Sequence, residues 1–353
     1  MQQARLRDIC TLQQWAPLPK RNFTPEGYPV YGANGIIGYS DKYNHRQPTI
    51  AITCRGDSCG NAVITQPFSY IAANAICLEN IADTVSQQYL YYCLKSADLS
   101  ACISGAAQPQ ITQKNLGNIQ VPIYPKERQQ YIADTLHKIE QTMLLRQQQL
   151  EAVKQLQASF FHRVFPTLMA AEHCPKRPLY QVADIHCGKR NAGDATPTGE
   201  YPFFSCAKTP RRISNYTYDC ECVLLTGNID FQIEYFHGKF DAYQRVYIIE
   251  SRHKNTAAVP YLYAFLQHYA PTLKQQAVGG IIKYIRRDML TNISIPLPDL
   301  KKQHRIGSFA LHTLKLGNDI LQSLQKEEEL FKSALTRFFR PHNTTAFNVN
   351  YFN

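Results

Sequence analysis

Polar and cationic residues gather in segments rich in glycine, asparagine and proline, a composition that predicts loops. In the first half of the chain they are Lys20, Arg21, Tyr31, Asn34, Arg55, Ser58, Gln108, Gln110 and Lys114. In the second half they are Lys189, Arg190, Lys208, Arg211, Arg212, Asn228, Lys283, Tyr284 and Arg286. Arginine can bind a guanine edge through two hydrogen bonds, and asparagine or glutamine can bind adenine. We therefore predict that these loops contact DNA.

The charge balance favours a polyanionic partner for both halves. The chain has 38 Lys and Arg against 27 Asp and Glu, a net charge of +11. Residues 1–126 hold 10 basic and 7 acidic residues, and residues 174–298 hold 15 and 10. The alternative for any single residue is a solvated charge, and Asn34-Gly35 is also typical of a hairpin turn. Clustering at matching places in both halves favours contact with phosphates and bases.

Sequences that carry enzyme chemistry are mostly missing. The chain has neither the phosphate-binding G-x-x-x-x-G-K-[ST] nor the zinc-binding H-E-x-x-H. It also lacks an Asn-Pro-Pro-Tyr tetrapeptide for base methylation and the Glu-x-Lys of many metal-dependent nucleases. We predict no catalytic residue and expect a binding protein.

The chain repeats one pattern at a constant separation of 174 residues. The pairs are Gly105 and Gly279, Ile111 and Ile285, Leu116 and Leu290, Asn118 and Asn292, Ile119 and Ile293, Pro122 and Pro296, Gln129 and Gln303, Arg163 and Arg337, and Phe165 and Phe339. A repeat of this length is a domain with its connector, well above the period of solenoids. We infer a tandem duplication with pseudo-twofold character.

Each half ends in a segment that predicts a long amphipathic helix. Residues 127–163 contain no proline or glycine, and their apolar positions follow heptad spacing. Pro166 is expected to end this helix, and Pro341 the second one, which starts near Leu300. Gly307 and Gly317 weaken the second helix. We expect an antiparallel pair with a globular domain at each end; the alternative is that each helix folds back on its own domain.

The remaining segments predict two mixed α/β or α+β units. Short runs rich in β-branched and aromatic residues predict strands, and they are 28–31, 49–53, 75–78, 201–205, 222–226 and 246–250. The predicted organisation is a first domain at 1–126, a helix at 127–165, a linker at 166–173, a second domain at 174–298, a helix at 299–341 and a tail at 342–353. Two cores fit a chain of 353 residues.

Eleven scattered cysteines and the lack of an apolar signal segment or membrane span favour the cytoplasm. Cys54 with Cys59 and Cys220 with Cys222 come closest to metal-ligand spacing, but neither forms the double C-x-x-C of a structural zinc site. We expect no bound metal.

In its order of motifs the chain resembles the specificity subunits of type I restriction-modification systems. The resemblance rests on segments 28–35 (YPVYGANG), 105–111 (GAAQPQI), 121–123 (VPI), 279–285 (GGIIKYI) and 295–298 (IPLP). It covers nearly the whole chain, in the order domain, helix, domain, helix. No single motif is decisive, whereas the order combined with the duplication is specific.

The resemblance implies two target recognition domains, separated by a pair of long antiparallel coiled-coil helices. Each domain would read one half of a bipartite, asymmetric site on double-stranded DNA. The helices would set the gap and dock two modification (methyltransferase) subunits, and restriction subunits would complete the complex. S-adenosylmethionine, ATP and magnesium would bind to those partners, leaving this chain without a cofactor.

Three other interpretations stay open at this point. The chain could be a stand-alone DNA-binding protein or the reader of a methyltransferase-only system, which neighbouring genes would distinguish. It could be an enzyme with an unrecognised site, which turnover by the purified chain would show. It could also be a protein scaffold, for which failure to bind any duplex at any salt concentration would be typical.

Overall fold

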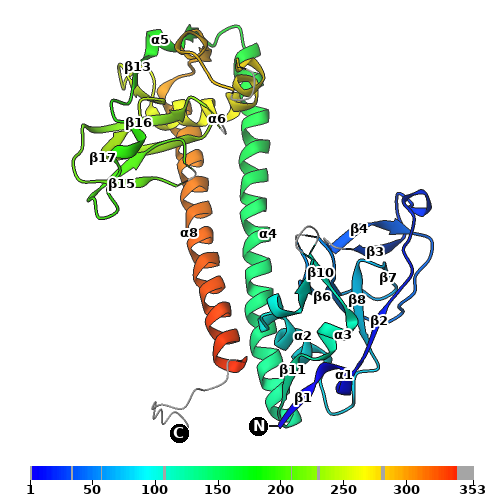
Figure 1. The fold of residues 1–353 in the computed structure, drawn as a ribbon. Helices are drawn as coiled ribbons and strands as arrows, with labels where there is room; N and C mark the ends of the chain where they lie inside the picture. The colour runs from blue at the N-terminus through cyan, green and yellow to red at the C-terminus, as the bar shows by residue number, and fades with distance from the viewer. Residues whose placement is uncertain are drawn as a thin grey trace. The chain divides into compact units, whose positions relative to one another are not determined.

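The computed structural model describes residues 2–32, 35–56, 58–105, 109–207, 209–228, 231–279 and 283–339. They form two compact units: unit 1 is Met1–Leu145 with Leu324–Asn353, and unit 2 is Arg146–Ser323. Each unit contains one globular portion and part of each of two long helices, α4 and α8 (Figure 1). The mixture of helices and strands confirms the predicted fold class. No helix in the described ranges has both the length and the hydropathy that crossing a bilayer requires.

Unit 1 is built on a four-stranded sheet in the order β2-β8-β5-β6 and a three-stranded sheet in the order β4-β3-β7. Its strands are β1 (Gln2–Arg5), β2 (Thr11–Gln14), β3 (Tyr28–Gly32), β4 (Gly35–Ser40), β5 (Ile50–Thr53), β6 (Ala62–Ile64), β7 (Tyr70–Ile71), β8 (Ala75–Glu79), β9 (Ile103–Ser104), β10 (Gln110–Ile111) and β11 (Gln120–Ile123). Its helices are α1 (Leu6–Ile9), α2 (Gln87–Ser96), α3 (Gln113–Gly117), the first part of α4 (Lys126–Ala170) and the last part of α8, with short 3-10 turns η1 (Lys20–Asn22) and η2 (Ser100–Cys102).

Unit 2 is built on a six-stranded sheet in the order β13-β18-β16-β17-β14-β15. Its strands are β12 (Lys176–Pro178), β13 (Ala183–Cys187), β14 (Tyr201–Phe204), β15 (Arg211–Ile213), β16 (Tyr218–Thr226), β17 (Ile233–Ala242), β18 (Val246–Ser251) and β19 (Ser294–Pro296). Its helices are the second part of α4, α5 (Leu179–Val182), the 3-10 turn η3 (Ala192–Asp194), α6 (Val259–Gln276), α7 (Arg287–Thr291) and the first part of α8 (Leu300–Phe339).

Each of the six segments expected to form strands contains a strand. The central strands of the unit 1 sheet show why an apolar run predicts one. Strands β5 and β8 are buried almost throughout, because the sheet continues on both sides of them and side chains cover both faces. Continuous apolar runs such as Ile50–Thr53 are typical of strands in that position. In unit 2, the long strands β16 and β17 pair over eight positions, and α6 packs against them.

The duplication extends to individual hydrogen bonds. In unit 1 the backbone N–H of Leu6 donates to the carbonyl of Ile119, and in unit 2 Leu179 donates to Ile293, at 2.9 and 2.8 Å. The first partners differ by 173 residues and the second by 174, so unit 2 has one residue more than unit 1 between the two bonded residues. The antiparallel strand pair β1–β11 of unit 1 corresponds to the antiparallel pair β12–β19 of unit 2.

A buried glutamine joins each long helix to its globular portion. The amide of Gln129 accepts a hydrogen bond from the N–H of Ser86 at 2.8 Å and donates to the carbonyls of Thr84 and Tyr124. The amide of Gln303 makes the same three bonds, with the N–H of Ala258 and with two carbonyls. Ser86 and Ala258 are the N-cap residues of α2 and α6. Each glutamine therefore satisfies backbone groups that a helix start leaves unpaired.

Helices α4 and α8 pack antiparallel in each unit, which confirms the predicted pair. In unit 2 the rings of Phe160 and Phe309 lie 4.1 Å apart, and Gln157 donates to Thr313 at 3.2 Å. In unit 1, Phe331 of α8 belongs to the core cluster that contains Leu136 of α4. The apolar stripe expected on α4 is accordingly buried or half-buried along its length.

The prediction that Pro166 ends the first helix is wrong, because α4 continues to Ala170. Proline removes one helical hydrogen bond and costs about 3 kcal/mol in a helix interior. Phe165 and Leu168 flank it and are buried in the core of unit 2, so tertiary packing holds this last turn in place. Part of the expected linker at 166–173 is therefore helical. The expected helix end at Pro341 and the tail at 342–353 lie outside the described residues.

Gly307 and Gly317 occupy different environments, although both lie inside α8. A Cβ at Gly307 would lie 2.7 Å from Cβ of Pro260 and 3.0 Å from backbone atoms of α6, whereas one at Gly317 would meet Leu150 at 3.8 Å. We expect Gly307→Ala to destabilise unit 2 by about 2 kcal/mol through overpacking. The matched variant Gly317→Ala should be neutral or stabilising by up to about 1 kcal/mol, because alanine favours helix. Denaturant unfolding of both variants checks this difference; equal effects would contradict it.

Candidate nucleic-acid interface

In unit 1 the structure brings together two loops that carry predicted contact residues. Arg55 and Gln110 form an isolated antiparallel β-bridge, and the flanking Ile111 N–H donates to the carbonyl of Cys54 at 3.1 Å. Gly56 N–H donates to the carbonyl of Pro109 at 3.3 Å. The side chains of Arg55 and Gln110 are exposed. A guanidinium and an amide are thus displayed next to each other on a fixed backbone.

In unit 2 the equivalent positions meet in the same way. Asn228 and Tyr284 form the matching isolated bridge, and Ile285 N–H donates to the carbonyl of Gly227 at 2.8 Å. Arg55 and Asn228 differ by 173 in number, and Gln110 and Tyr284 by 174. The two units therefore present different side chains on one repeated backbone feature.

The glycine at the start of the second loop has a specific backbone role in both units. Gly105 has φ +89° and Gly279 has φ +115°. Residues with a Cβ rarely adopt these conformations, so the repeated glycine lets each loop turn where another residue would be strained.

A cavity of about 320 Å³ lies beside the bridge of unit 2. Its lining includes Gln244, Arg245, Tyr247 and Tyr284. The N–H of Gly227 donates to the carbonyl of Arg245 at 2.8 Å, and the hydroxyl of Tyr247 donates to the carbonyl of Ile285 at 2.9 Å. These bonds tie the turn between β17 and β18 to the bridge. The cavity is open to solvent and carries side chains that can hydrogen-bond a base edge.

Sequence reasoning missed Gln244 and Arg245. Both are exposed in the turn between β17 and β18. The available signal was a pair of long polar side chains between two strand-like runs. Such a pair is common in solvated turns, and only the pairing of β16 with β18 places it beside Tyr284.

Arg190 has a structural partner that the sequence did not reveal. Its Nε donates to Oδ2 of Asp241 at 2.8 Å, and the Asp241 side chain is fully buried. Thr217 donates to the same oxygen at 2.7 Å. The hydrogen bond and the charge of Asp241 raise the pKa of the Arg190 guanidinium. Arg190 therefore anchors the loop that carries Lys189, which is exposed.

We expect Arg190→Ala to destabilise unit 2 by about 2 kcal/mol, because it removes a charged donor from a buried carboxylate. The value is below that of a fully buried pair, since the Arg190 side chain is 37% exposed. Lys189→Ala is the matched control, with an expected change under about 0.5 kcal/mol. Thermal unfolding measures both; indistinguishable melting temperatures would show that the Asp241 contact contributes nothing.

The other predicted contact residues have varied positions. Exposed cationic side chains lie on η1, α3, β15 and the segment before α7, and they are Lys20, Arg21, Lys114, Arg211, Arg212, Lys283 and Arg286. Ser58 lies half-buried in the turn after Arg55. Asn34, Gln108 and Lys208 fall outside the described residues.

Tyr31 and Asn228 are buried, in contrast to the other predicted contact residues that the structure describes. Tyr31 packs in a small core cluster, and its hydroxyl accepts a hydrogen bond from the N–H of Gln66 at 3.1 Å. The Asn228 side chain accepts a hydrogen bond from the thiol of Cys206. Neither side chain faces solvent, so the DNA contact predicted for each of them stays a prediction.

Gly56 to Gly60 read Gly-Asp-Ser-Cys-Gly, which has the G-x-S-x-G spacing of a hydrolase nucleophile turn. In hydrolases that turn leads from a strand into a helix. Here β5 precedes the segment and β6 follows it, so it joins two strands. The Ser58 carbonyl also accepts a hydrogen bond from the hydroxyl of Thr53. The spacing therefore lacks the structural context that would make Ser58 a nucleophile.

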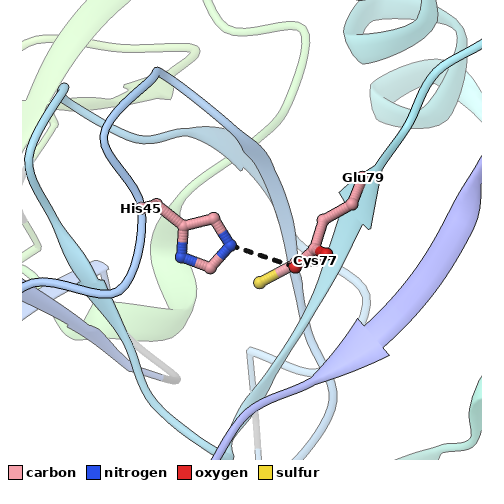
Figure 2. A group of neighbouring side chains, drawn as sticks. All are labelled: His45, Cys77 and Glu79. Atoms are coloured by element: carbon pink, nitrogen blue, oxygen red, sulfur yellow. Dashed lines mark hydrogen bonds and ion pairs between the residues drawn. The ribbon is translucent and has the colours of Figure 1, made fainter.

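One group of side chains in unit 1 could hold a metal ion. His45, Cys77 and Glu79 each offer one ligand atom, and these atoms all lie within 4.8 Å of one another (Figure 2). In the part of the chain that the structure describes, neither Cys54 with Cys59 nor Cys220 with Cys222 belongs to such a group. The two cysteine pairs nearest to metal-ligand spacing are thus not where the ligand atoms converge.

Comparison with known proteins gives a consistent family match. The family model described as "Type I restriction modification DNA specificity domain" matches the chain twice, over residues 1–155 and 174–330. The EcoDI type I restriction enzyme specificity subunit of Escherichia coli is 34% identical over 170 residues, which are 48% of this chain and 37% of that protein. A Haemophilus influenzae protein named as a type I restriction enzyme specificity subunit is 25% identical over 354 residues, 88% of each chain. The aligned segment is thus little more than a third of the EcoDI subunit.

Two solved structures share the fold. The S subunit of a type I restriction-modification system from M. genitalium superposes with a TM-score of 0.80 over 97% of this chain and 96% of that chain. A chain from a study of complex assembly and conformational transition in a type I system gives a TM-score of 0.52 over 96% and 97%. Each is 16% identical to this chain, so the likeness concerns the fold.

Proposed function

The chain belongs to the family of type I restriction modification DNA specificity domains, and from this premise we propose that it is the DNA-reading subunit of such a system. One observation carries the proposal beyond family membership. The bridges Arg55–Gln110 and Asn228–Tyr284 occupy equivalent places in the two units, and their exposed side chains differ: Arg55 and Gln110 in unit 1, Tyr284 in unit 2. A duplicated reader with diverged contact residues is suited to a site with two unlike halves.

The side chains available in each unit support different readings. Unit 1 offers an arginine and a glutamine at its bridge, the residue types that recognise guanine and adenine. Unit 2 offers an exposed tyrosine beside a cavity lined by Gln244 and Arg245. The cationic side chains on neighbouring elements would bind phosphates and fix the register on the duplex. Each unit would therefore read its own half-site.

The long helices would set the gap between the half-sites and dock the modification subunits. Helix α4 has 45 residues, which at 1.5 Å per residue is about 68 Å. One turn of B-DNA is about 34 Å, so such a helix can separate two readers by more than one turn. We further propose that two methyltransferase subunits bring S-adenosylmethionine and that restriction subunits bring ATP and magnesium. This chain would act as a non-catalytic address for them.

Exchange of one unit tests the modular assignment. Residues 1–125 are replaced by the equivalent domain of a relative with a different specificity, and the hybrid is expressed with the modification subunits. We expect that the sequence of one half-site of the methylated sites changes and that the sequence of the other half-site stays the same. A change in both halves would contradict independent reading by the two units.

A further inference from the structure

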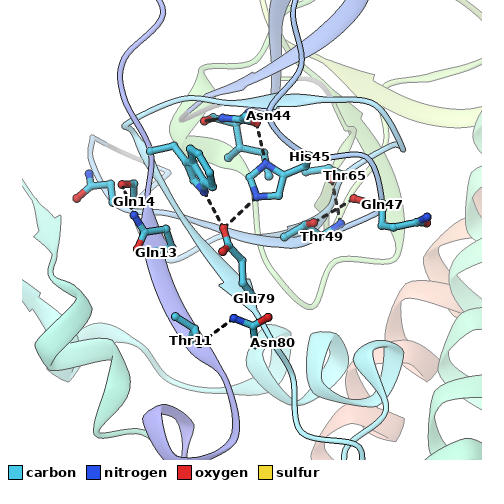
Figure 3. A network of polar contacts seen from close by, with 12 residues as sticks. Thr11, Gln13, Gln14, Asn44, His45, Gln47, Thr49, Thr65, Glu79 and Asn80 are labelled. Atoms are coloured by element: carbon cyan, nitrogen blue, oxygen red, sulfur yellow. Dashed lines mark hydrogen bonds and ion pairs between the residues drawn. The ribbon is translucent and has the colours of Figure 1, made fainter.

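The tautomer of His45 in unit 1 is fixed by its neighbours. The side chain of Asn44, which Figure 3 shows beside His45, makes two hydrogen bonds with the backbone of Ile71: its Oδ1 accepts from the N–H at 2.8 Å, and its Nδ2 donates to the carbonyl at 3.0 Å. The orientation of the amide is therefore unambiguous. Nδ1 of His45 lies 2.7 Å from that same Oδ1, an atom that only accepts. Nδ1 must carry a hydrogen, which leaves Nε2 as the bare nitrogen of a neutral ring.

The bare nitrogen faces a carboxylate. Nε2 of His45 lies 3.1 Å from Oε1 of Glu79, and the indole N–H of Trp15 donates to that same oxygen at 2.7 Å. Two lone pairs at this separation repel each other unless a positive centre lies between them. Either a proton or a metal ion must supply it.

The sulfur of Cys77 favours a metal ion over a proton at this position. Cys77 and Glu79 are two residues apart on β8, so their side chains point to the same face of the strand. Cys77 is fully buried, and its sulfur lies within 4.8 Å of the other two ligand atoms. An ion pair between His45 and Glu79 needs no thiol beside it. A nitrogen, a sulfur and a carboxylate oxygen together form a donor set that zinc prefers.

The surroundings also match those of metal ligands. Histidine ligands usually donate their second ring N–H to a carbonyl or carboxylate oxygen, and carboxylate ligands are themselves hydrogen-bonded. Asn44 serves His45 in this way, and Trp15 serves Glu79. Two ligand atoms at about 2.0–2.1 Å from a tetrahedral zinc ion lie about 3.3 Å apart. The observed 3.1 Å between Nε2 and Oε1 is close to that value.

We propose that unit 1 binds one zinc ion through Nε2 of His45, Sγ of Cys77 and a carboxylate oxygen of Glu79. The Glu79 side chain is 25% exposed, so water can reach the fourth position. Coordination releases the thiol proton of Cys77 to solvent. The ion cross-links the segment between β4 and β5, which carries His45, to strand β8. This cross-link within unit 1 goes beyond the proposed reading of DNA.

Metal analysis of the full chain tests this site, with the partner subunits co-expressed. The protein is equilibrated with zinc chloride, unbound zinc is removed by gel filtration, and the zinc content of the protein is measured. We expect one zinc ion per chain for the wild type and for Cys93→Ser, and none for Cys77→Ser. Cys93 is the matched control because it is a buried cysteine of the same unit, on α2.

A second readout identifies the ligand atom in the wild type itself, where the folding of a variant plays no part. Titration of the wild type with cobalt chloride should produce, at one equivalent, the near-ultraviolet absorption of a thiolate bound to Co²⁺. Cys93→Ser should keep this band and Cys77→Ser should lose it. The proposal is overturned if the wild type binds neither zinc nor cobalt stoichiometrically, or if Cys77→Ser retains the bound metal and the band.

Discussion

Replacing Gln303 with leucine should lower the stability of unit 2 by about 3 kcal/mol. Leucine has a similar size but cannot bond to the N–H of Ala258 or to the carbonyls of Thr256 and Pro298. Each buried polar group left unsatisfied costs about 1–3 kcal/mol, and the loss is largest for Ala258 N–H, which is buried. For a unit of this size the melting temperature should fall by about 6–12 °C.

The control for this substitution is Gln155→Leu. Gln155 is exposed on α4 within the same unit and donates only to Glu151. A change under about 0.5 kcal/mol is expected there. Thermal and denaturant unfolding of both variants provide the measurement. If Gln303→Leu melts together with Gln155→Leu, the glutamine does not hold the helix to its domain.

Arg245→Ala should relax recognition of one base pair in one half-site by about 10- to 100-fold. Arg245 is exposed at the cavity next to Tyr284, where its guanidinium can bind a base edge. A two-bond contact of this kind contributes about 1–3 kcal/mol of discrimination, and about 1.4 kcal/mol is a factor of ten. Methylation by the complex carrying this variant should spread to sites that differ at that position, while the other half-site stays unchanged.

Arg252→Ala is the matched control for Arg245→Ala. Both arginines flank β18, at its opposite ends, and Arg252 forms an exposed ion pair with Asp184. Removing it should leave the set of methylated sites unchanged. If Arg245→Ala also leaves the set of methylated sites unchanged, the turn between β17 and β18 does not contact the bases.

The duplication and its long helices could be predicted because their signals are local or strictly periodic. Gly105 and Gly279 both have a positive φ, and Gln129 and Gln303 each make three equivalent hydrogen bonds. The same local geometry therefore constrains the residue type at both positions of each pair. The strand at 50–53 was evident because a central strand is apolar on both faces. The end of α4 could not be predicted, because the packing of Phe165 outweighs the local effect of Pro166.

The contact residues were less predictable, because exposure depends on partners distant in the sequence. Arg190 reads as a free cation until Asp241, 51 residues away, is placed beside it. Arg245 reads as an ordinary turn residue until strand pairing brings it to the cavity that Tyr284 lines. His45 lies 32 residues before Cys77, so no short spacing announces their convergence. In each instance the residue types were visible and their neighbours were not.

The central claim is that the two units read two different half-sites of one DNA sequence. Mapping of methylated adenines in DNA from cells that carry this chain with its modification subunits tests it most directly. The account predicts a single split motif, with two unlike halves separated by a fixed number of unread base pairs. A continuous motif, a palindrome, or methylation without sequence preference would contradict it.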